Sequence, residues 1–253
     1  MIQAIVFDLD GTLVKSEELK GLSYAIAVQQ LRGLAEPDPR AIEAYKDVVG
    51  AAREEASRHV IAKLDLEPDL AGKLSAGDSR EPWHLLTEMR TSIYENMVAD
   101  PQVIRDNQWP HTVALLRSAR EAYCYTALAT MSQHREAAHV LKALDLVNSL
   151  DVVLAREDVL NPKPDPEIYL LAAERLGVLP SECLALEDSA NGVRAAIAAG
   201  TNVVALATPF TSVGLHEADI IDDCFIVHSP EELLDVVKHR TEEHNRTARG
   251  TGA

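Results

Sequence analysis

The sequence predicts an α/β protein whose doubly wound parallel-sheet core, of the Rossmann-like type, carries an inserted all-helical domain. The first observation is a short apolar strand signal at residues 2–8, rich in Ile, Val and Phe. The second is a strand–helix alternation that starts near residue 100, and the third is the almost purely helical pattern of residues 15–98. Alternation of this kind indicates parallel strands covered by helices on both faces. We expect the first strand to join that sheet.

The elements follow from local patterns. In the insert, apolar residues recur at helical spacing, for example at Ala25, Val28 and Leu31. One later helix should begin with Asp165 as N-cap and end at Gly177, and another should run from Ser189 to Ala199, before Gly200. Beyond the first strand, the strands are expected at residues 123–130, 151–155, 183–187, 202–206 and 224–228.

These elements divide the chain into three parts. Residues 1–14 and 99–238 are expected to form the α/β core, and residues 15–98 the helical insert. Residues 239–253 have no apolar periodicity, so we expect a flexible C-terminal tail.

Composition excludes several classes of protein. The formal net charge is −16, from 24 Lys and Arg against 40 Asp and Glu, which disfavours nucleic acid and anionic membranes as partners. No apolar run approaches the roughly 20 residues of a membrane span. Three scattered cysteines and the absence of a signal-peptide pattern favour a reducing compartment, the cytoplasm. None of the nine histidines is predicted to bind a metal.

Polar side chains follow the predicted strands where ligands bind in open parallel sheets. They are Asp8 and Asp10, Thr130 and Ser132, Glu187 and Asp188, together with Lys163 on a loop before a helix. Clustered carboxylates suit Mg²⁺, which prefers oxygen ligands and commonly also binds a substrate phosphate. One carboxylate can attack phosphorus, a second can move protons, and a lysine can offset the negative charge.

The chain resembles the haloacid dehalogenase superfamily at these residues. FDLDGTL (7–13), LATMS (128–132), NPKPDPEIY (161–169) and LEDSANGVRAAIAAG (186–200) resemble its four motifs in order. The resemblance implies that Asp8 is the nucleophile, Asp10 the acid and base, Thr130 a phosphoryl-binding group and Lys163 the charge-balancing cation. It also implies Mg²⁺ held by Asp8, Asp10, Glu187 and Asp188, with Ser132 near the substrate.

The helical insert resembles the C1 cap of that superfamily, and KPDPEIY with EDSANG resembles its β-phosphoglucomutase-like subgroup. GAAR (50–53) and RTSIY (90–94) resemble cap segments that face the substrate, so Lys20, Arg53 and Arg90 are expected to bind substrate. Exposed helix arginines that bind nothing are the alternative for Arg53 and Arg90.

The resemblance implies a phosphatase that acts on a small phosphorylated metabolite, a sugar phosphate, as a monomer or homodimer. An acid at Asp10 favours phosphoryl transfer, because dehalogenating members lack it. A sugar-phosphate mutase is the alternative, although Lys20 stands where mutases have a histidine and Lys15 where the subgroup often has Asp. A catalytically silent binding protein on the same fold is the third possibility.

Overall fold

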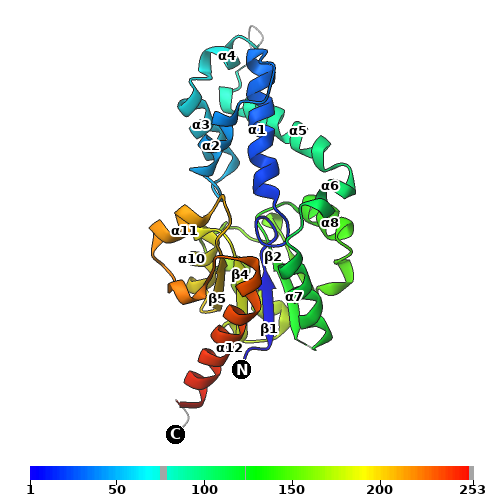
Figure 1. Cartoon of the computed structure of the whole chain (residues 1–253), viewed down its shortest axis with the longest axis vertical. Helices are drawn as coiled ribbons and strands as arrows, with labels where there is room; N and C mark the ends of the chain where they lie inside the picture. The colour runs from blue at the N-terminus through cyan, green and yellow to red at the C-terminus, as the bar shows by residue number, and fades with distance from the viewer. Residues whose placement is uncertain (75–78, 123, 251–253) are drawn as a thin grey trace. The chain divides into compact units, whose positions relative to one another are not determined.

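The computed structural model of the chain describes residues 1–74, 79–122 and 124–250. It divides the chain into two compact units. The core unit comprises Met1–Lys15 and Ile104–Ala253, and the helical unit comprises Ser16–Val103 (Figure 1). The insert thus begins next to the expected residue 15 but extends beyond residue 98.

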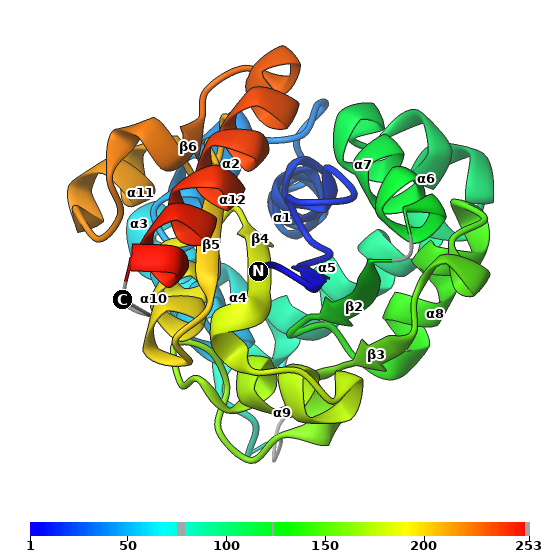
Figure 2. The same ribbon diagram turned by 90° about the horizontal axis from the view of Figure 1, so that it is seen from below.

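A six-stranded parallel sheet in the order β3-β2-β1-β4-β5-β6 forms the centre of the core unit (Figure 2). Central β1 pairs with β2 and with β4, so that Ala4 lies opposite both Tyr125 and Cys183. All six strands fall within the predicted ranges, and the α/β fold with its parallel sheet is confirmed. The strands are β1 (Ala4–Phe7), β2 (Tyr125–Ala129), β3 (Val152–Leu154), β4 (Cys183–Glu187), β5 (Asn202–Leu206) and β6 (Ile226–Val227).

Helices cover both faces of this sheet. On one face α9 contacts β1 and β2 while α10 contacts β4 and β5; on the other, α7 and α12 contact the sheet and each other (Figure 2). The boundary between the two units falls within α6 (Pro101–Asp106). The later helices are α7 (Pro110–Glu121), α8 (His134–Ala143), α9 (Glu167–Leu176), α10 (Ala190–Ala198), α11 (Ser212–Ala218) and α12 (Leu233–Gly250).

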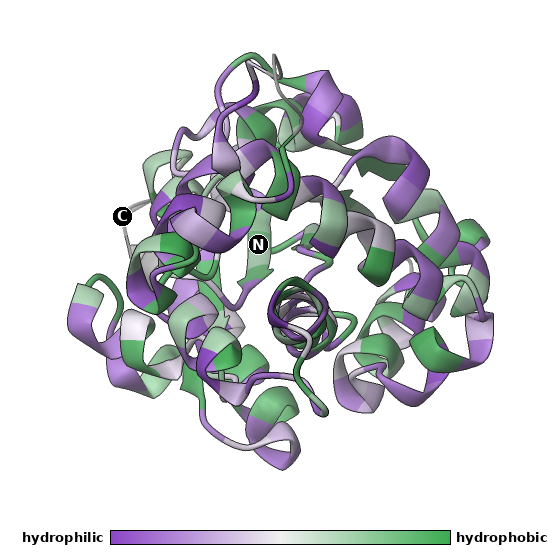
Figure 3. Ribbon diagram, turned by 90° about the horizontal axis from the view of Figure 1, so that it is seen from above, coloured by the Kyte–Doolittle hydropathy of each residue, from purple (hydrophilic) through white to green (hydrophobic). Residues whose placement is uncertain are grey.

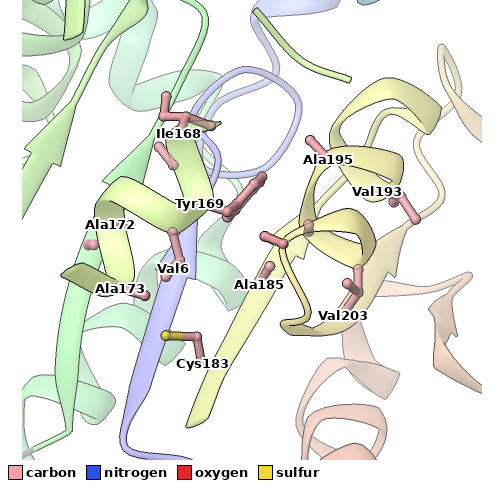
Figure 4. Packing of buried hydrophobic residues seen from close by; sticks show 14 of the residues in the cluster. Val6, Ile168, Tyr169, Ala172, Ala173, Cys183, Ala185, Val193, Ala195 and Val203 are labelled. Atoms are coloured by element: carbon pink, nitrogen blue, oxygen red, sulfur yellow. The ribbon is translucent and has the colours of Figure 1, made fainter. Parts of the chain in front are cut away.

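Small apolar side chains let the helices pack closely on the sheet. Successive strand residues point to opposite faces, so Ala4 and Val6 of β1 face α9 and α10, and both are fully buried. Figure 4 shows buried side chains of α9, α10 and the strands, among them Val6, Tyr169 and Ala185, gathered between these helices and the sheet. A strand buried on both sides explains why residues 2–8 read as a continuous apolar run.

The two predicted helix ends are found close to the expected residues. The Asp165 carboxylate accepts a hydrogen bond from the Glu167 N–H at 3.0 Å, and α9 ends at Gly177, whose φ of +71° suits glycine. The Ser189 hydroxyl caps α10 by accepting from the Gly192 N–H at 3.1 Å.

The C-terminal segment differs from the prediction. A flexible tail from residue 239 was expected, but α12 continues through Gly250, so the prediction was wrong for residues 239–250. The Phe225 ring packs on His239 with 5.6 Å between ring centroids, and the Arg240 guanidinium lies 4.4 Å from its centroid. These tertiary contacts stabilise the charged part of α12 from residue 239 onward, where the sequence has no apolar periodicity. Residues 251–253 lie outside the described residues.

The helical unit comprises α1 (Ser16–Arg32), α2 (Pro39–Lys46), α3 (Arg53–Leu64), α4 (Glu67–Ala71) and α5 (Pro82–Val98). α1 packs on α2 and α5, and Tyr24, Val28 and Leu86 are buried among these helices. Hydrophilic and hydrophobic residues are mixed along the helices of the molecule (Figure 3). Within the described parts of the chain, no helix combines the length and apolar character needed to cross a membrane.

Candidate active site

The strand order brings the candidate site residues together. Asp8, Thr130 and Glu187 each follow or end one of three neighbouring strands, β1, β2 and β4. The chain proceeds from β1 outward to β2 and β3 and then returns to β4 on the other side of β1. A crevice beyond the strand ends is expected at such a reversal, which is where ligands bind in open α/β sheets.

The loop after β1 depends on a glycine. The Asp8 N–H extends the sheet by donating to the Leu186 carbonyl at 3.0 Å, and Gly11 then turns the chain with φ of +81°. A Cβ atom at Gly11 would lie 1.9 Å from the Asp188 carboxylate oxygen Oδ2. The absence of a side chain therefore allows the loop to approach Asp188, and a larger residue would both strain the backbone and displace that carboxylate.

Lys163 joins the three strands through its ammonium group. It donates to Asp8 Oδ1 at 2.7 Å, to the Ala129 carbonyl at 2.8 Å and to Glu187 Oε1 at 2.5 Å. Burial favours the neutral amine, but the charges of Asp8 and Glu187 outweigh it and raise the pKa of Lys163 above its ordinary value. Lys163 is therefore a fixed positive charge between two carboxylates.

The site carries more negative than positive charge. Burial raises the pKa of Asp8 to about 8; Lys163 opposes this shift, while Glu187 and Asp10 add to it. Carboxylate oxygens of Asp8, Glu187 and Asp188 all lie within 4.8 Å of one another. An all-oxygen, anionic donor set fits a hard divalent cation such as Mg²⁺, which would stabilise the charged form of Asp8.

Glu187 is held by three donors. Its Oε1 accepts from Lys163 and from the Tyr169 hydroxyl at 2.6 Å, and its Oε2 accepts from the Ser189 hydroxyl at 3.3 Å. A Cβ atom at Gly192 would lie 2.0 Å from this carboxylate, so the first turn of α10 closes around it. Burial and the Glu187 charge raise the pKa of Tyr169 well above its ordinary value and keep its hydroxyl a donor.

Asp10 lies beside the second strand. The Ser132 hydroxyl donates to Asp10 Oδ2 at 2.5 Å, and the Ser132 N–H donates to Thr130 Oγ1 at 3.0 Å. Thr130 itself is fully buried at the end of β2. The structure therefore brings Asp10, Thr130 and Ser132 into one hydrogen-bonded group, and Ser132 contacts a candidate acid and base directly.

The three cations expected to bind substrate lie in the helical unit. Lys20 pairs with Glu17 at 2.9 Å, and the Arg90 guanidinium lies 5.4 Å from the centre of the Tyr24 ring. Arg90 is 7% exposed, so it is not the exposed helix arginine considered as its alternative. Arg53 is exposed at the first residue of α3.

Two contributors to the site were not identified from the sequence as functional. Tyr169 belongs to the quoted NPKPDPEIY segment, but only its packing against Glu187 reveals a contact with the site. Gly192 ends the quoted EDSANG segment, but only its distance to the Glu187 carboxylate shows why a glycine is needed there. The signal for Tyr169 was a tyrosine six residues after Lys163, and the signal for Gly192 was the glycine that ends the quoted EDSANG segment.

Comparison with known proteins extends these observations. The family model for haloacid dehalogenase-like hydrolases matches residues 2–200. A phosphorylated carbohydrates phosphatase of Thermotoga maritima is 29% identical over 241 residues, covering 94% of this chain and 99% of the relative. Phosphoglycolate phosphatase of Escherichia coli is 27% identical over 226 residues, covering 87% and 88%.

Solved structures agree on the fold. A putative β-phosphoglucomutase from Thermotoga maritima has a TM-score of 0.67 at 27% identity, covering 94% of this chain and 99% of that one. A β-phosphoglucomutase from Clostridium difficile has a TM-score of 0.68 at 20% identity, covering 96% and 99%, and so bears on the fold alone.

The match to the family model extends over most of the chain, and the phosphatase relatives match it over nearly their whole length. This confirms the resemblance seen in the four motifs and the expectation of an enzyme that hydrolyses phosphate monoesters. The chain belongs to the haloacid dehalogenase-like hydrolase family, within which it is a phosphoric monoester hydrolase.

Proposed function

We propose that the enzyme is a Mg²⁺-dependent phosphatase that hydrolyses a small sugar phosphate through a phosphorylated Asp8. The observation that carries this proposal is the contact of buried Asp8 with Lys163 beside Glu187 and Asp188. Relatives named for phosphorylated carbohydrates and for phosphoglycolate support a small phosphorylated metabolite as substrate.

The chemistry takes two steps. A carboxylate oxygen of Asp8 attacks phosphorus and forms an O–P bond while the ester P–O bond breaks, and Asp10 gives its proton to the leaving oxygen. Water then attacks the aspartyl-phosphate, Asp10 takes a proton from that water, and Asp8 and inorganic phosphate are released. The hydrogen bond from Ser132 to Asp10 Oδ2 orients the acid for both proton transfers.

The remaining site residues would stabilise negative charge on the phosphoryl group and on Asp8. Lys163 orients Asp8 and offsets charge on the phosphoryl group, and the Thr130 hydroxyl binds a phosphoryl oxygen. Asp8, the Asp10 backbone carbonyl and Asp188 would hold Mg²⁺. Glu187 already accepts three hydrogen bonds, so its main role would be to hold Lys163 in place. It would lie in or near the coordination shell of the metal. When bound, Mg²⁺ would neutralise negative charge at the attacked phosphoryl group.

We further propose that the insert is a cap that chooses the substrate. Its cations Lys20, Arg53 and Arg90 would attract an anionic metabolite toward a protein of net charge −16. Arginine can bind a second phosphate or a carboxylate through two parallel hydrogen bonds. A closed cap would exclude bulk water while Asp8 is phosphorylated.

The decisive variant is Asp8→Asn, which is nearly isosteric but cannot attack phosphorus. Phosphate release from a panel of phosphorylated metabolites should fall at least about 10⁴-fold, as is typical when a nucleophile is removed. Circular dichroism should remain unchanged. Retention of more than about 1% of the wild-type rate would contradict the assignment of Asp8.

The same assay distinguishes a phosphatase from a mutase. Glucose 1-phosphate should give free phosphate in step with substrate loss. Accumulation of glucose 6-phosphate without phosphate release would identify a mutase instead, while inactivity on every ester with Mg²⁺ present would indicate a silent binding protein.

A further inference from the structure

A second group of possible metal ligands lies in the core unit, on residues other than those of the candidate active site. His216 lies on α11, Asp223 begins the short 3-10 helix η4 (Asp223–Phe225), and His228 follows β6, all in the orange part of the chain (Figure 2). One ligand atom from each residue lies within 4.8 Å of the other two. Histidines twelve positions apart gave no such signal in the sequence.

Two of the three ligand–ligand distances are close to those around a tetrahedral ion. Asp223 Oδ1 lies 3.2 Å from His228 Nε2 and 3.7 Å from His216 Nε2. Ligands bound at about 2.0–2.1 Å to a tetrahedral Zn²⁺ are separated by about 3.3 Å. The two histidine nitrogens lie within 4.8 Å of each other, so the side chains would have to rotate toward one another to coordinate one ion.

The orientation of His216 provides a second, independent indication. Its Nδ1 lies 2.6 Å from the Ser212 carbonyl, so in the neutral ring Nδ1 carries the proton and donates it. The Nε2 atom of this neutral ring faces the Asp223 carboxylate at 3.7 Å, so its lone pair is directed to the place where a shared cation would bind. Metal-binding histidines in proteins are commonly held in this way, with the second ring nitrogen donating to a carbonyl.

The ligand types select the class of metal. Two imidazoles with one carboxylate favour a borderline ion such as Zn²⁺, whereas Mg²⁺ prefers an all-oxygen set. The side chains of His216, Asp223 and His228 are 45%, 74% and 44% exposed, which leaves access for water as a fourth ligand.

We propose that His216, Asp223 and His228 bind Zn²⁺, with water in the fourth position. The ion would join α11 to the segment that contains η4 and the edge strand β6. The site would bind its ion independently of the phosphatase chemistry proposed for Asp8.

Zn²⁺ titration of the full chain, without an affinity tag and with Mg²⁺ in excess, tests the proposal. The wild type should bind one more equivalent than the double variant His216→Ala/His228→Ala, or bind that equivalent at least about tenfold more tightly. Mutating a residue that only hydrogen-bonds to a metal ligand typically lowers metal affinity 10–100-fold, so removing the ligands themselves should lower it at least as much. His134→Ala is the matched control, because exposed His134 pairs with a single carboxylate, Asp158, at 2.7 Å. It should keep the extra equivalent.

Ring signals of the histidines in NMR spectra of the wild type locate the ion without any substitution. Signals of His216 and His228 should shift together over one equivalent of Zn²⁺, while that of His134 stays in place. Equal stoichiometry and affinity in wild type and double variant, or shifts confined to other histidines, would overturn the proposal. Enzyme activity is not needed for either readout.

Discussion

At Gly192 the first turn of α10 comes so close to the Glu187 carboxylate that a methyl group would occupy its space. We expect Gly192→Ala to displace Glu187 and, with it, the Lys163 ammonium. Turnover should fall at least about tenfold, which corresponds to a loss of about 1.4 kcal/mol of transition-state stabilisation. The measurement is kcat on a generic phosphate ester.

Gly214→Ala is the matched control for that substitution. Gly214 also lies in a helix, but nothing within 4 Å would meet its Cβ atom. It should leave kcat unchanged and stabilise the fold slightly, since alanine favours helices by up to about 1 kcal/mol over glycine. Equal rates for Gly192→Ala and wild type would show that Glu187 tolerates displacement.

Arg53→Ala tests the proposed role of the cap in substrate choice. KM for the preferred sugar phosphate should rise by about 10–150-fold. The reason is that losing the hydrogen bonds between the Arg53 guanidinium and an anionic group of the substrate costs about 1.5–3 kcal/mol of binding free energy. p-Nitrophenyl phosphate lacks a second anionic group, so its kcat should change little. Arg58→Ala, on the same helix and paired with Glu54 and Glu81, controls for loss of an exposed arginine. If both substrates lose kcat equally, Arg53 affects the chemistry or the fold instead.

The sequence predicted that Asp8, which follows a strand, and Lys163, on the loop before a helix, lie in one site. The structure places Lys163 Nζ 2.7 Å from Asp8 Oδ1, while the catalytic roles of both residues stay predictions. Tyr169 and Gly192 were missed as functional because their roles depend on packing between α9, α10 and β4. The alternative that Arg90 is an exposed arginine was wrong, because its burial against Tyr24 depends on packing between two helices and cannot be predicted from the sequence of one.

At the scale of elements, the N-terminus of α2 is capped by the buried side chain of Asp38. The Asp38 carboxylate accepts from the Arg40 N–H at 3.0 Å and pairs with the Arg40 guanidinium at 2.6 Å. Asp38→Ala should lower the free energy of unfolding of the helical unit by about 0.5–2 kcal/mol. Asp38→Asn keeps a cap of similar quality and should lose only the contribution of the ion pair.

The contribution of Asp38 should depend on pH. The hydrogen bond from Arg40 holds the pKa of Asp38 below its ordinary value of 3.8. Stability from the charged carboxylate is therefore fully present above about pH 4 and is lost as pH falls through the lowered pKa. Urea unfolding at neutral pH and near pH 3 should show a smaller difference between wild type and Asp38→Asn at the lower pH. A constant difference would contradict this reasoning.

Element types were predicted better than their ends. Each strand lay within its expected range because apolar runs between turn residues identify buried strands. The prediction for residues 239–250 failed, because charge composition alone does not reveal that Phe225 provides a packing surface for α12. Local sequence determined where these elements begin; contacts from elsewhere in the chain decided whether α12 continued.

At the scale of the whole molecule, metal binding should couple activity to stability. We expect EDTA to abolish turnover and Mg²⁺ to restore it. At 100 times its Kd, Mg²⁺ should stabilise the core unit by about 2.7 kcal/mol, which corresponds to a rise in Tm of about 5–10 °C. Asp188→Ala should reduce this rise more than Glu187→Ala, because Glu187 is held by three donors. Thermal melts with and without Mg²⁺ measure the difference, and the reverse order would contradict the proposed ligand set.

The position of β1 has a consequence for synthesis on the ribosome. Residues Ala4–Phe7 are synthesised before either of their partner strands, which begin at Tyr125 and Cys183. All of Ser16–Val103 has been translated before either partner exists, and that segment makes a compact unit of its own. We therefore expect the inserted helices to fold while β1, which has been translated before them, is still exposed and unpaired in the nascent chain. That strand would be the segment most in need of protection by a chaperone until the second half of the protein has been made.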